Sequence, residues 1–241
     1  MGWNITGADE LEDAIFELKL EIALKIGVRQ GMRIVDVGCG QGGFTAALGR
    51  TVGNHGKVQA VDVSDEYLAE FNERLAKHGV ENAVTFIQAD ATCLSSVISE
   101  GTADIVTAYR LLEELQCCGD MPEVIAQMAT IVKRGGRVCL AELNAETKNE
   151  AEENYVRLHK ESGDCFFKPA QVIRAMRRAG LTNVFEENVE TCIWLSSELS
   201  KRDLSHAQVW FDADVKKSLG VLIDKYGLKY PTFTVFSGTR K

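Results

Sequence analysis

Short apolar runs and helical repeats of apolar residues alternate along most of the chain. Residues 8–26 place Leu11, Leu18 and Ile22 on one face and charged residues elsewhere, which predicts an amphipathic helix that ends at Gly27. The runs that follow are short and rich in Val, Ile and Ala, as in strands that are buried on both faces of a parallel sheet. They lie at 32–37, 58–62, 84–87, 105–109 and 138–143, near Val184 and Phe185, and at 233–236.

Helix signals separate these runs. Ser64 is placed to cap a helix that Gly79 closes, and Pro122 opens a helix that Gly135-Gly136 is expected to end. Pro169 opens a further helix, before the sixth run. Strand and helix thus alternate at short intervals, which predicts an α/β fold with a parallel sheet covered by helices on both faces.

The alternation of strand and helix signals stops at residues 190–229, which contain aromatic residues and a helical repeat instead. This segment is too short for a core of its own, so we expect a single domain over residues 1–241. Its parts are an N-terminal helical cap (1–29), a cofactor-binding core (30–189), a helical insertion (190–229) and a final strand (230–241). Trp194, Trp210 and Phe211 favour a role for the insertion as an apolar lid.

Glycines are densest at residues 38–43, between the first predicted strand and a helix from Phe44. Gly38, Gly40 and Gly42 can take backbone angles closed to other residues and let a ligand approach the main chain. The unpaired N–H groups at the start of the next helix attract an anionic group. The pattern therefore predicts a loop that binds a nucleotide cofactor.

Two cofactor classes fit such a loop. Gly38, Gly40 and Gly43 satisfy the dinucleotide pattern G-x-G-x-x-G, and Asp62, at the end of the second strand, is placed to hold ribose hydroxyls. Asp36 precedes the first glycine, and Asp90 ends the third strand. A carboxylate at Asp90 can accept a hydrogen bond from an exocyclic amino group while the Ala91 N–H donates to a ring nitrogen, a pairing that indicates adenine.

Six segments in this order resemble the class I S-adenosylmethionine-dependent methyltransferases. They are VDVGCGQGG (35–43), AVDVSDEYL (60–68), IQADA (87–91), ADIVTAYRLLEEL (103–115), VKRGGRVCLAEL (132–143) and MRRAGLTNV (176–184). The resemblance covers about residues 30 to 189 and the strand at 233–236. It implies a seven-stranded, mostly parallel, doubly wound sheet with an antiparallel last strand, and S-adenosyl-L-methionine as the cofactor.

The resemblance also implies roles for individual residues. Asp36 would order the loop, and the glycines would pass beneath the methionine part of the cofactor. Asp62 would hold the ribose and Asp90 the adenine, while Tyr109 would lie near the sulfonium. The full set expected to bind the cofactor is Asp36, Gly38, Cys39, Gly40, Gly42, Asp62, Val63, Asp90, Ala91 and Tyr109.

The methyl acceptor is poorly marked. Asn-Pro-Pro-Tyr, which in this superfamily marks attack by an amide or aromatic amine, is absent after the fourth strand. Tyr109, Arg110, Glu113 and Glu142 fall at or after strand ends, where ligands bind in open α/β sheets. Of these, Tyr109, Arg110 and Glu142 are the candidate catalytic residues. The pair Cys117-Cys118 leaves a redox or metalloid role open, although cysteine is also a common core residue.

Composition and charge limit the kinds of partner that we expect. A net charge of -8 disfavours nucleic acid, and no apolar run is long enough to span a bilayer. The histidines and the seven cysteines show no metal-ligand spacing, so we expect no metal site. An odd number of scattered cysteines favours a reducing compartment, and we expect the cytoplasm. The oligomeric state stays open, with a homodimer as one option.

The sequence therefore predicts an enzyme that transfers a methyl group from S-adenosylmethionine to a small-molecule acceptor by in-line displacement. Catalysis would then rest mainly on positioning and desolvation. A protein or tRNA methyltransferase is one alternative, which a basic or peptide-sized groove would favour. A non-catalytic S-adenosylmethionine-binding protein is another, and it would have a filled acceptor pocket.

Overall fold

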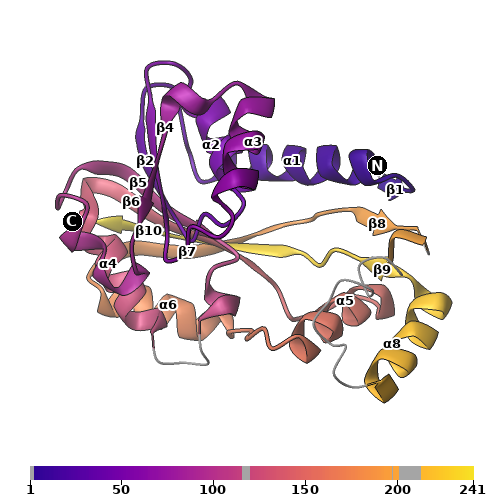
Figure 1. Ribbon diagram of the computed structural model, residues 1–241. Helices are drawn as coiled ribbons and strands as arrows, with labels where there is room; N and C mark the ends of the chain where they lie inside the picture. The colour runs from indigo at the N-terminus through magenta and orange to yellow at the C-terminus, as the bar shows by residue number, and fades with distance from the viewer. Residues whose placement is uncertain (1–2, 116–119, 197, 201–212) are drawn as a thin grey trace.

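The computed structural model describes residues 3–115, 120–196, 198–200 and 213–241. At its centre lies a seven-stranded sheet with the strand order β4-β3-β2-β5-β6-β10-β7 (Figure 1). Its strands are β2 (Arg33–Val37), β3 (Lys57–Asp62), β4 (Val84–Gln88), β5 (Ala103–Tyr109), β6 (Val132–Leu143), β7 (Leu181–Val189) and β10 (Phe233–Arg240). Strands β2 to β6 pair in parallel, whereas β10 runs antiparallel to both β6 and β7. The predicted sheet and its antiparallel last strand are confirmed.

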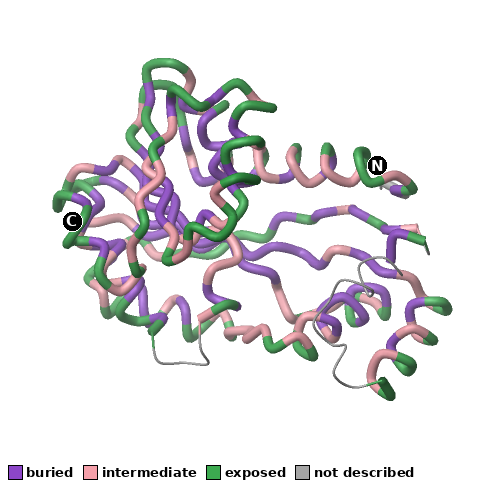
Figure 2. The backbone as a smooth tube through the Cα atoms, in the orientation of Figure 1, coloured by how far each residue is buried: buried purple, intermediate pink, exposed green. Residues whose placement is uncertain are grey.

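Helices cover both faces of this sheet, as the alternation predicts (Figure 1). Ile34 of β2 packs in the cluster that includes the buried faces of α1 and α2, whereas Val35 and Val37 pack with α4 and α6. The central strands are accordingly buried on both sides (Figure 2). The helices are α1 (Ala8–Lys25), α2 (Gly43–Val52), α3 (Leu68–His78), α4 (Met121–Ile131), α5 (Glu150–Glu161), α6 (Pro169–Arg178) and α8 (Ala213–Tyr226), with short 3-10 turns η1 (Glu81–Ala83), η2 (Ala91–Ser96) and η3 (Leu112–Glu114).

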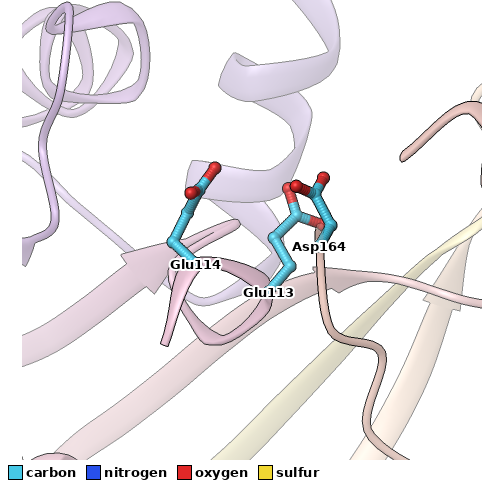
Figure 3. A group of neighbouring side chains, drawn as sticks. All are labelled: Glu113, Glu114 and Asp164. Atoms are coloured by element: carbon cyan, nitrogen blue, oxygen red, sulfur yellow. The ribbon is translucent and has the colours of Figure 1, made fainter. Parts of the chain in front are cut away.

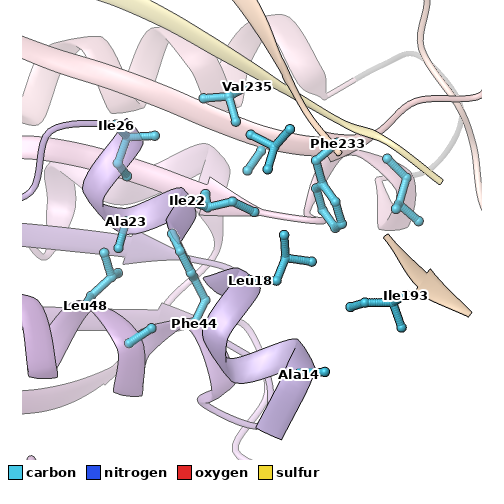
Figure 4. Close-up of a cluster of buried hydrophobic side chains, with 14 of the residues drawn as sticks. Ala14, Leu18, Ile22, Ala23, Ile26, Phe44, Leu48, Ile193, Phe233 and Val235 are labelled. Carbon is cyan, nitrogen blue, oxygen red and sulfur yellow. The ribbon is translucent and has the colours of Figure 1, made fainter. Parts of the chain in front are cut away.

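The apolar face of α1 closes one side of the core. Leu18 and Ile22 pack in one buried cluster with Phe44 of α2 and Phe233 of β10 (Figure 4). Burial of each such side chain stabilises the fold by about 1.5–3 kcal/mol. The N-terminal helix is thus part of the same core as the sheet, and its polar side reaches the carboxyl ends of the strands.

The glycine pair Gly135-Gly136 lies inside a strand and does not end a helix, which corrects the sequence prediction. Helix α4 stops at Ile131 and β6 begins at the next residue. Gly135 has a φ of 76°, and the pairing of β6 with β5 shifts register between Ala103 and Ile105. The glycines therefore lie at an irregular bend within β6, where residues 133–136 stand against Asp104 of β5, and such a bend favours the same residue type as a helix end.

Ser64 does not cap a helix. Helix α3 begins at Leu68, and the Ser64 hydroxyl accepts a hydrogen bond from the N–H of Glu66 at 3.1 Å, before the helix starts. The serine stabilises the turn that leads from β3 into α3. The prediction that Gly79 ends this helix is confirmed, since Gly79 is its C-terminal cap in the left-handed conformation.

A second, three-stranded sheet joins the N-terminus to the insertion. Strand β1 (Trp3–Ile5) pairs in parallel with β8 (Ile193–Leu195), which pairs antiparallel with β9 (Leu228–Lys229). The insertion is therefore only partly helical. Strands of two or three residues are too short for the period-two pattern to show in a sequence.

Of the residues that the sequence singled out, Cys117, Cys118, Trp210 and Phe211 lie outside the described ranges. Cys39, Cys93, Cys139 and Cys192 carry free thiols, whereas Cys165 takes part in a disulfide, which the expectation of a reducing compartment does not account for. Within the described residues, no helix combines the length and the apolar character needed to cross a bilayer.

Candidate active site

A cleft of about 950 Å³ opens at the carboxyl ends of the parallel strands β2, β3 and β5 and beside the residues that follow β4. Ligands bind at this edge of α/β sheets, because the loops there converge. The cleft brings together most residues that the sequence singled out. Those in its lining are Gly38, Cys39, Gly40, Asp62, Val63, Asp90, Ala91, Tyr109, Arg110 and Glu113.

The loop after β2 is tightly bound to the end of β3. The backbone N–H groups of Gly38 and Cys39 both donate to the Val61 carbonyl, at 2.8 and 3.0 Å. Gly40, with a φ of 46°, donates its N–H to Oδ2 of Asp62 at 2.8 Å. A Cβ atom on Gly40 would have no neighbour within 4 Å. The loop therefore holds its shape while its Gly40 side stays open to a ligand.

The two strand-end carboxylates keep accepting capacity beside their structural bonds. Asp62 accepts from Gly40 and, through Oδ1, from the Ser64 N–H at 3.2 Å. Asp90 accepts from the N–H and hydroxyl of Thr92 through Oδ1 alone, at 2.8 and 2.7 Å. These hydrogen bonds lower the pKa of the Asp90 carboxyl, so it is ionised at neutral pH. A carboxylate offers about four acceptor sites, so both can also bind a ligand.

Asp36 and Gly42 support the loop on the side that faces away from the cleft. Asp36 is 1% exposed, and its Oδ2 accepts a hydrogen bond from the Thr45 hydroxyl at 2.5 Å. Burial raises the pKa of Asp36 to about 7. Gly42 is the N-terminal cap of α2 and packs against Phe71. Neither residue lines the cleft, so any effect on a ligand passes through the loop and α2.

Two cationic side chains lie at the start of α2 and were not predicted from the sequence. Lys19 of α1 places its Nζ 2.3 Å from where a Cβ of Gly43 would stand, and Nη1 of Arg74 lies 3.4 Å from the same point. Arg74 also donates to the Gln41 carbonyl at 3.2 Å. Among the described residues, neither cation forms an ion pair with a carboxylate. Burial, together with the charge of Arg74, lowers the pKa of Lys19 to about 8.

These cations stand beside the unpaired N–H groups of a helix N-terminus, and together they make an anion site. Lys19 lies on the polar side of a predicted amphipathic helix, where lysine is usually solvated. Nothing in the periodicity separates it from its neighbours. Only the packing of α1 onto α2 reveals its place.

Tyr109 is fixed by aromatic neighbours at the end of β5. Its ring stacks between Phe44 and Phe233, with centroid distances of 5.1 Å to each, and Nζ of Lys19 lies 5.3 Å from its centroid. Burial raises the pKa of the Tyr109 hydroxyl, which stays protonated. The side chain is suited to positioning a ligand rather than to acting as a base.

A charged network follows Tyr109. Arg110 has a φ of 55°, a strained conformation for a residue other than glycine, and its Nε donates to Oε1 of Glu113 at 2.5 Å. Its Nη2 lies 3.4 Å from Nδ1 of His159, which is 2.6 Å from Oδ2 of Asp164. Burial raises the pKa of Glu113. These polar contacts, which reach His159 of α5, thus hold Arg110 in its strained backbone conformation.

Glu142 lies outside the lining of the cleft. It is buried, and Oε1 accepts a hydrogen bond from the Leu112 N–H at 3.2 Å. Burial raises the pKa of its carboxyl well above the usual value, and Glu113 adds to this rise. It adjoins a separate cavity of about 20 Å³ with Phe166 and Phe167. The geometry gives Glu142 a part in holding η3, the turn that carries Glu113.

A second cavity of about 400 Å³ adjoins the cleft under α1. Its walls include Leu11, Ile15 and Phe16 of α1, and Leu199 of the insertion. It shares Lys19 and Arg74 with the cleft, together with Gln41 and Gly43. An apolar region bounded by the N-terminal cap and the insertion thus opens beside the glycine loop.

The strand order, the glycine loop and the carboxylates at successive strand ends define a class I, Rossmann-like S-adenosylmethionine-dependent methyltransferase. A family profile described as a methyltransferase domain matches residues 29–198. The chain belongs to this family, and the resemblance seen in the sequence is confirmed. Helix α1 with Lys19, the helix α8 and the final strand lie outside the matched residues.

Several known proteins are similar to the chain. A ubiquinone/menaquinone biosynthesis C-methyltransferase of Idiomarina loihiensis is 32% identical over 118 residues, which are 49% of this chain and 45% of that protein. A probable cobalt-precorrin-6B C(15)-methyltransferase (decarboxylating) of Saccharolobus solfataricus is 26% identical over 162 residues, 63% of this chain and 77% of that one. The match thus spans less than half of the first relative's length.

Solved structures share the fold over nearly the whole chain. A cyclopropane-fatty-acyl-phospholipid synthase-like protein from Lactobacillus casei superposes with a TM-score of 0.75 at 16% identity, covering 99% of this chain and 95% of that one. A geranyl diphosphate C-methyltransferase from Streptomyces coelicolor gives 0.61 at 14% identity, covering 98% and 85%. At these identities the likeness concerns the fold alone.

Proposed function

We propose that the chain transfers a methyl group from S-adenosylmethionine to a small-molecule acceptor held in the cleft. One observation carries the proposal. A single cleft of about 950 Å³ joins the glycine loop, two strand-end carboxylates and two cations. When bound, S-adenosylmethionine supplies a methyl group activated by a sulfonium, a good leaving group.

The residues around the cleft fit this cofactor in donor and acceptor type. Asp62 accepts hydrogen bonds from the ribose hydroxyls, and Asp90 with the Ala91 N–H holds the adenine edge. Lys19 and Arg74 hold the carboxylate of the methionine part beside the N-terminus of α2. The open space at Gly40 fits the passage of a ligand close to the main chain.

The acceptor lies beside Tyr109 and Arg110 in the lining of the cleft. The stacked ring of Tyr109 gives it a fixed surface, and an acceptor held against this ring loses part of its water. The cavity under α1 meets the cleft at Lys19 and Arg74 and adds apolar surface there. Proximity and desolvation of this kind can contribute roughly 7 to 11 kcal/mol to a transfer reaction.

Three observations favour a small molecule over a macromolecule and over mere binding. The net charge of -8 opposes nucleic acid. The cleft and adjoining cavity leave room for an acceptor, whereas a protein that only binds the cofactor would have no need of it. The similar proteins are named for ubiquinone and menaquinone, a precorrin and geranyl diphosphate, all small molecules.

The test incubates the full chain with S-adenosylmethionine and a cell extract that has been split into a small-molecule filtrate and a macromolecular retentate. Mass spectrometry then measures S-adenosylhomocysteine. We expect formation with the filtrate, and much slower formation with the Asp62→Ala variant at a cofactor concentration near the wild-type KM. Formation with the retentate alone would point to a protein or tRNA substrate. Binding of S-adenosylhomocysteine without turnover in either fraction would leave a non-catalytic binding protein.

A further inference from the structure

Three carboxylates converge beside the cleft. Glu113 and Glu114 are neighbours in η3, and Asp164 follows α5 (Figure 3). One carboxylate oxygen from each lies within 4.8 Å of the others. Glu113 and Glu114 also line the cleft that holds the glycine loop. Residues 50 positions apart in the sequence thus meet at one wall of the cleft.

One carboxylate oxygen of this group has no hydrogen-bond partner in the described part of the chain. The side chain of Glu113 is 3% exposed, and its Oε2 is buried with no hydrogen-bond partner among the described residues. A buried polar atom without a partner costs about 1–3 kcal/mol, and more when it is charged. Arg110 pairs with Glu113 and His159 with Asp164, whereas Glu114 forms no ion pair among the described residues. The unpartnered Oε2 of Glu113 and the carboxylate of Glu114 are therefore open to a cation.

Neighbours hold one oxygen of each of two carboxylates in the group. Arg110 holds Oε1 of Glu113, and His159 holds Oδ2 of Asp164 at 2.6 Å, which leaves Oε2 of Glu113 and Oδ1 of Asp164 for a ligand. Figure 3 shows the carboxyl groups of Glu113 and Asp164 side by side, with that of Glu114 on the neighbouring residue of the turn. Partners that hold the far oxygen of a ligand are typical of metal sites.

We propose that Glu113, Glu114 and Asp164 bind a hard divalent cation of the Mg²⁺ or Mn²⁺ type at the wall of the cleft. A ligand set made only of carboxylate oxygens suits these ions rather than softer ones such as Zn²⁺. Three protein ligands leave coordination positions open, and the cleft lies on that side. Oxygens of the acceptor, such as a carboxylate, a phosphate or adjacent hydroxyls, complete the shell. This last part rests on the proposed function.

Titration of the full chain with MnCl2, after chelator treatment and with no cofactor present, tests the site. We expect one bound ion per chain, by calorimetry and by electron paramagnetic resonance of Mn²⁺. Glu114→Gln and Asp164→Asn should each weaken binding at least tenfold. Glu114 is exposed, so its variant will fold. Glu100→Gln is the matched control, since Glu100 is exposed and precedes β5 at the opposite edge of the sheet.

The absence of a bound ion, or equal binding by wild type and both variants, would overturn the proposal. A proton shared among the carboxylates would give the first of these results. The titration needs no methyl transfer, so it stands even if no S-adenosylhomocysteine is ever formed. If the ion binds as expected but its removal leaves the KM for the acceptor unchanged, the part that concerns acceptor oxygens is wrong.

Discussion

The N–H of Gly40 donates to the Asp62 carboxylate across 2.8 Å, so the glycine loop is tied to the end of the neighbouring strand. Asp62 is also not the cap of α3, which begins at Leu68 without a side-chain cap. One carboxylate therefore shapes the loop that a cofactor would cross and faces the cleft at the place where a ribose would lie. These two tasks can be separated by substitution.

Asp62→Ala should weaken S-adenosylhomocysteine binding by about 1.5 to 3 kcal/mol, roughly ten- to a hundredfold, as expected for charged hydrogen bonds. Asp62→Asn should recover little, because one of its acceptors becomes an amide donor, while both Gly40 and Ser64 present N–H groups to this side chain. Isothermal titration calorimetry, with thermal melts to check folding, makes the measurement. Asp65→Asn is the control, three residues further along. Wild-type affinity in the Asp62→Asn protein would mean that Asp62 holds no ribose.

Asp90→Asn separates the capping role of Asp90 from ligand binding. Both hydrogen bonds from Thr92 reach Oδ1, which an asparagine keeps as its carbonyl oxygen, and asparagine caps as well as aspartate. The melting temperature should therefore hardly change. Affinity for S-adenosylhomocysteine should fall, and the loss should shrink for an analogue without the adenine amino group. An equal loss for both ligands would place the adenine elsewhere.

The sequence predicted the sheet well because each strand of a parallel sheet is a compact apolar run, visible without knowledge of its neighbours. It failed where one signal has two meanings. Gly135-Gly136 fits a helix end and a bend within a strand equally, and the register shift against β5 that decides between them depends on another strand. The small sheet of β1, β8 and β9 was missed because its strands are too short to carry a pattern.

The sequence likewise predicted some residues of the site and not others. Asp62 and Asp90 were found because parallel strands bring their carboxyl ends to one edge. Lys19, His159 and Asp164 were missed because they come from α1, α5 and the segment after it, and only helix packing brings Lys19 to the cleft and the other two to Arg110 and Glu113. The expectation of no metal site rested on spacing along the chain alone, and it stays a prediction that the titration with Mn²⁺ tests.

Lys19→Met should lower the affinity for S-adenosylhomocysteine roughly ten- to a hundredfold, because a charged hydrogen bond contributes roughly 1.5 to 3 kcal/mol. The pKa of Lys19 is lowered to about 8, so its ammonium is present below pH 8 and is lost above it. Wild-type affinity should therefore fall as the pH rises through 8 and above, since a bound carboxylate draws the pKa back upward. The variant should show no such fall.

Two controls sharpen this test. Methylthioadenosine lacks the amino-acid carboxylate, so its affinity should be equal in wild type and Lys19→Met. Lys25→Met changes another lysine of α1, which pairs with Glu187 at 2.8 Å, and it should leave both affinities unchanged. If methylthioadenosine binding falls as much as that of S-adenosylhomocysteine, Lys19 supports the fold of the loop rather than the carboxylate.

A buried ion pair joins the insertion to the core and tests whether the chain is one domain. Lys229 of β9 pairs with Glu152 of α5, whose side chain is 1% exposed, and the other Glu152 oxygen accepts the Lys148 N–H at 2.8 Å. Lys229→Met leaves this carboxylate without its cation, so it should lower the free energy of unfolding by about 3–5 kcal/mol. Adding Glu152→Gln, which removes the charge but keeps an acceptor for Lys148, should restore most of the loss.

Urea unfolding followed by circular dichroism and by tryptophan fluorescence gives the measurement, because Trp194 in β8 lies in the insertion. In a single domain both signals change together, and Lys229→Met moves the one transition to lower urea. If the insertion were independent, fluorescence would change at lower urea in the variant while the circular dichroism of the sheet kept its midpoint. We expect coincident transitions, because β8 pairs with β1 ahead of α1, whose apolar face is buried against α2 and β10.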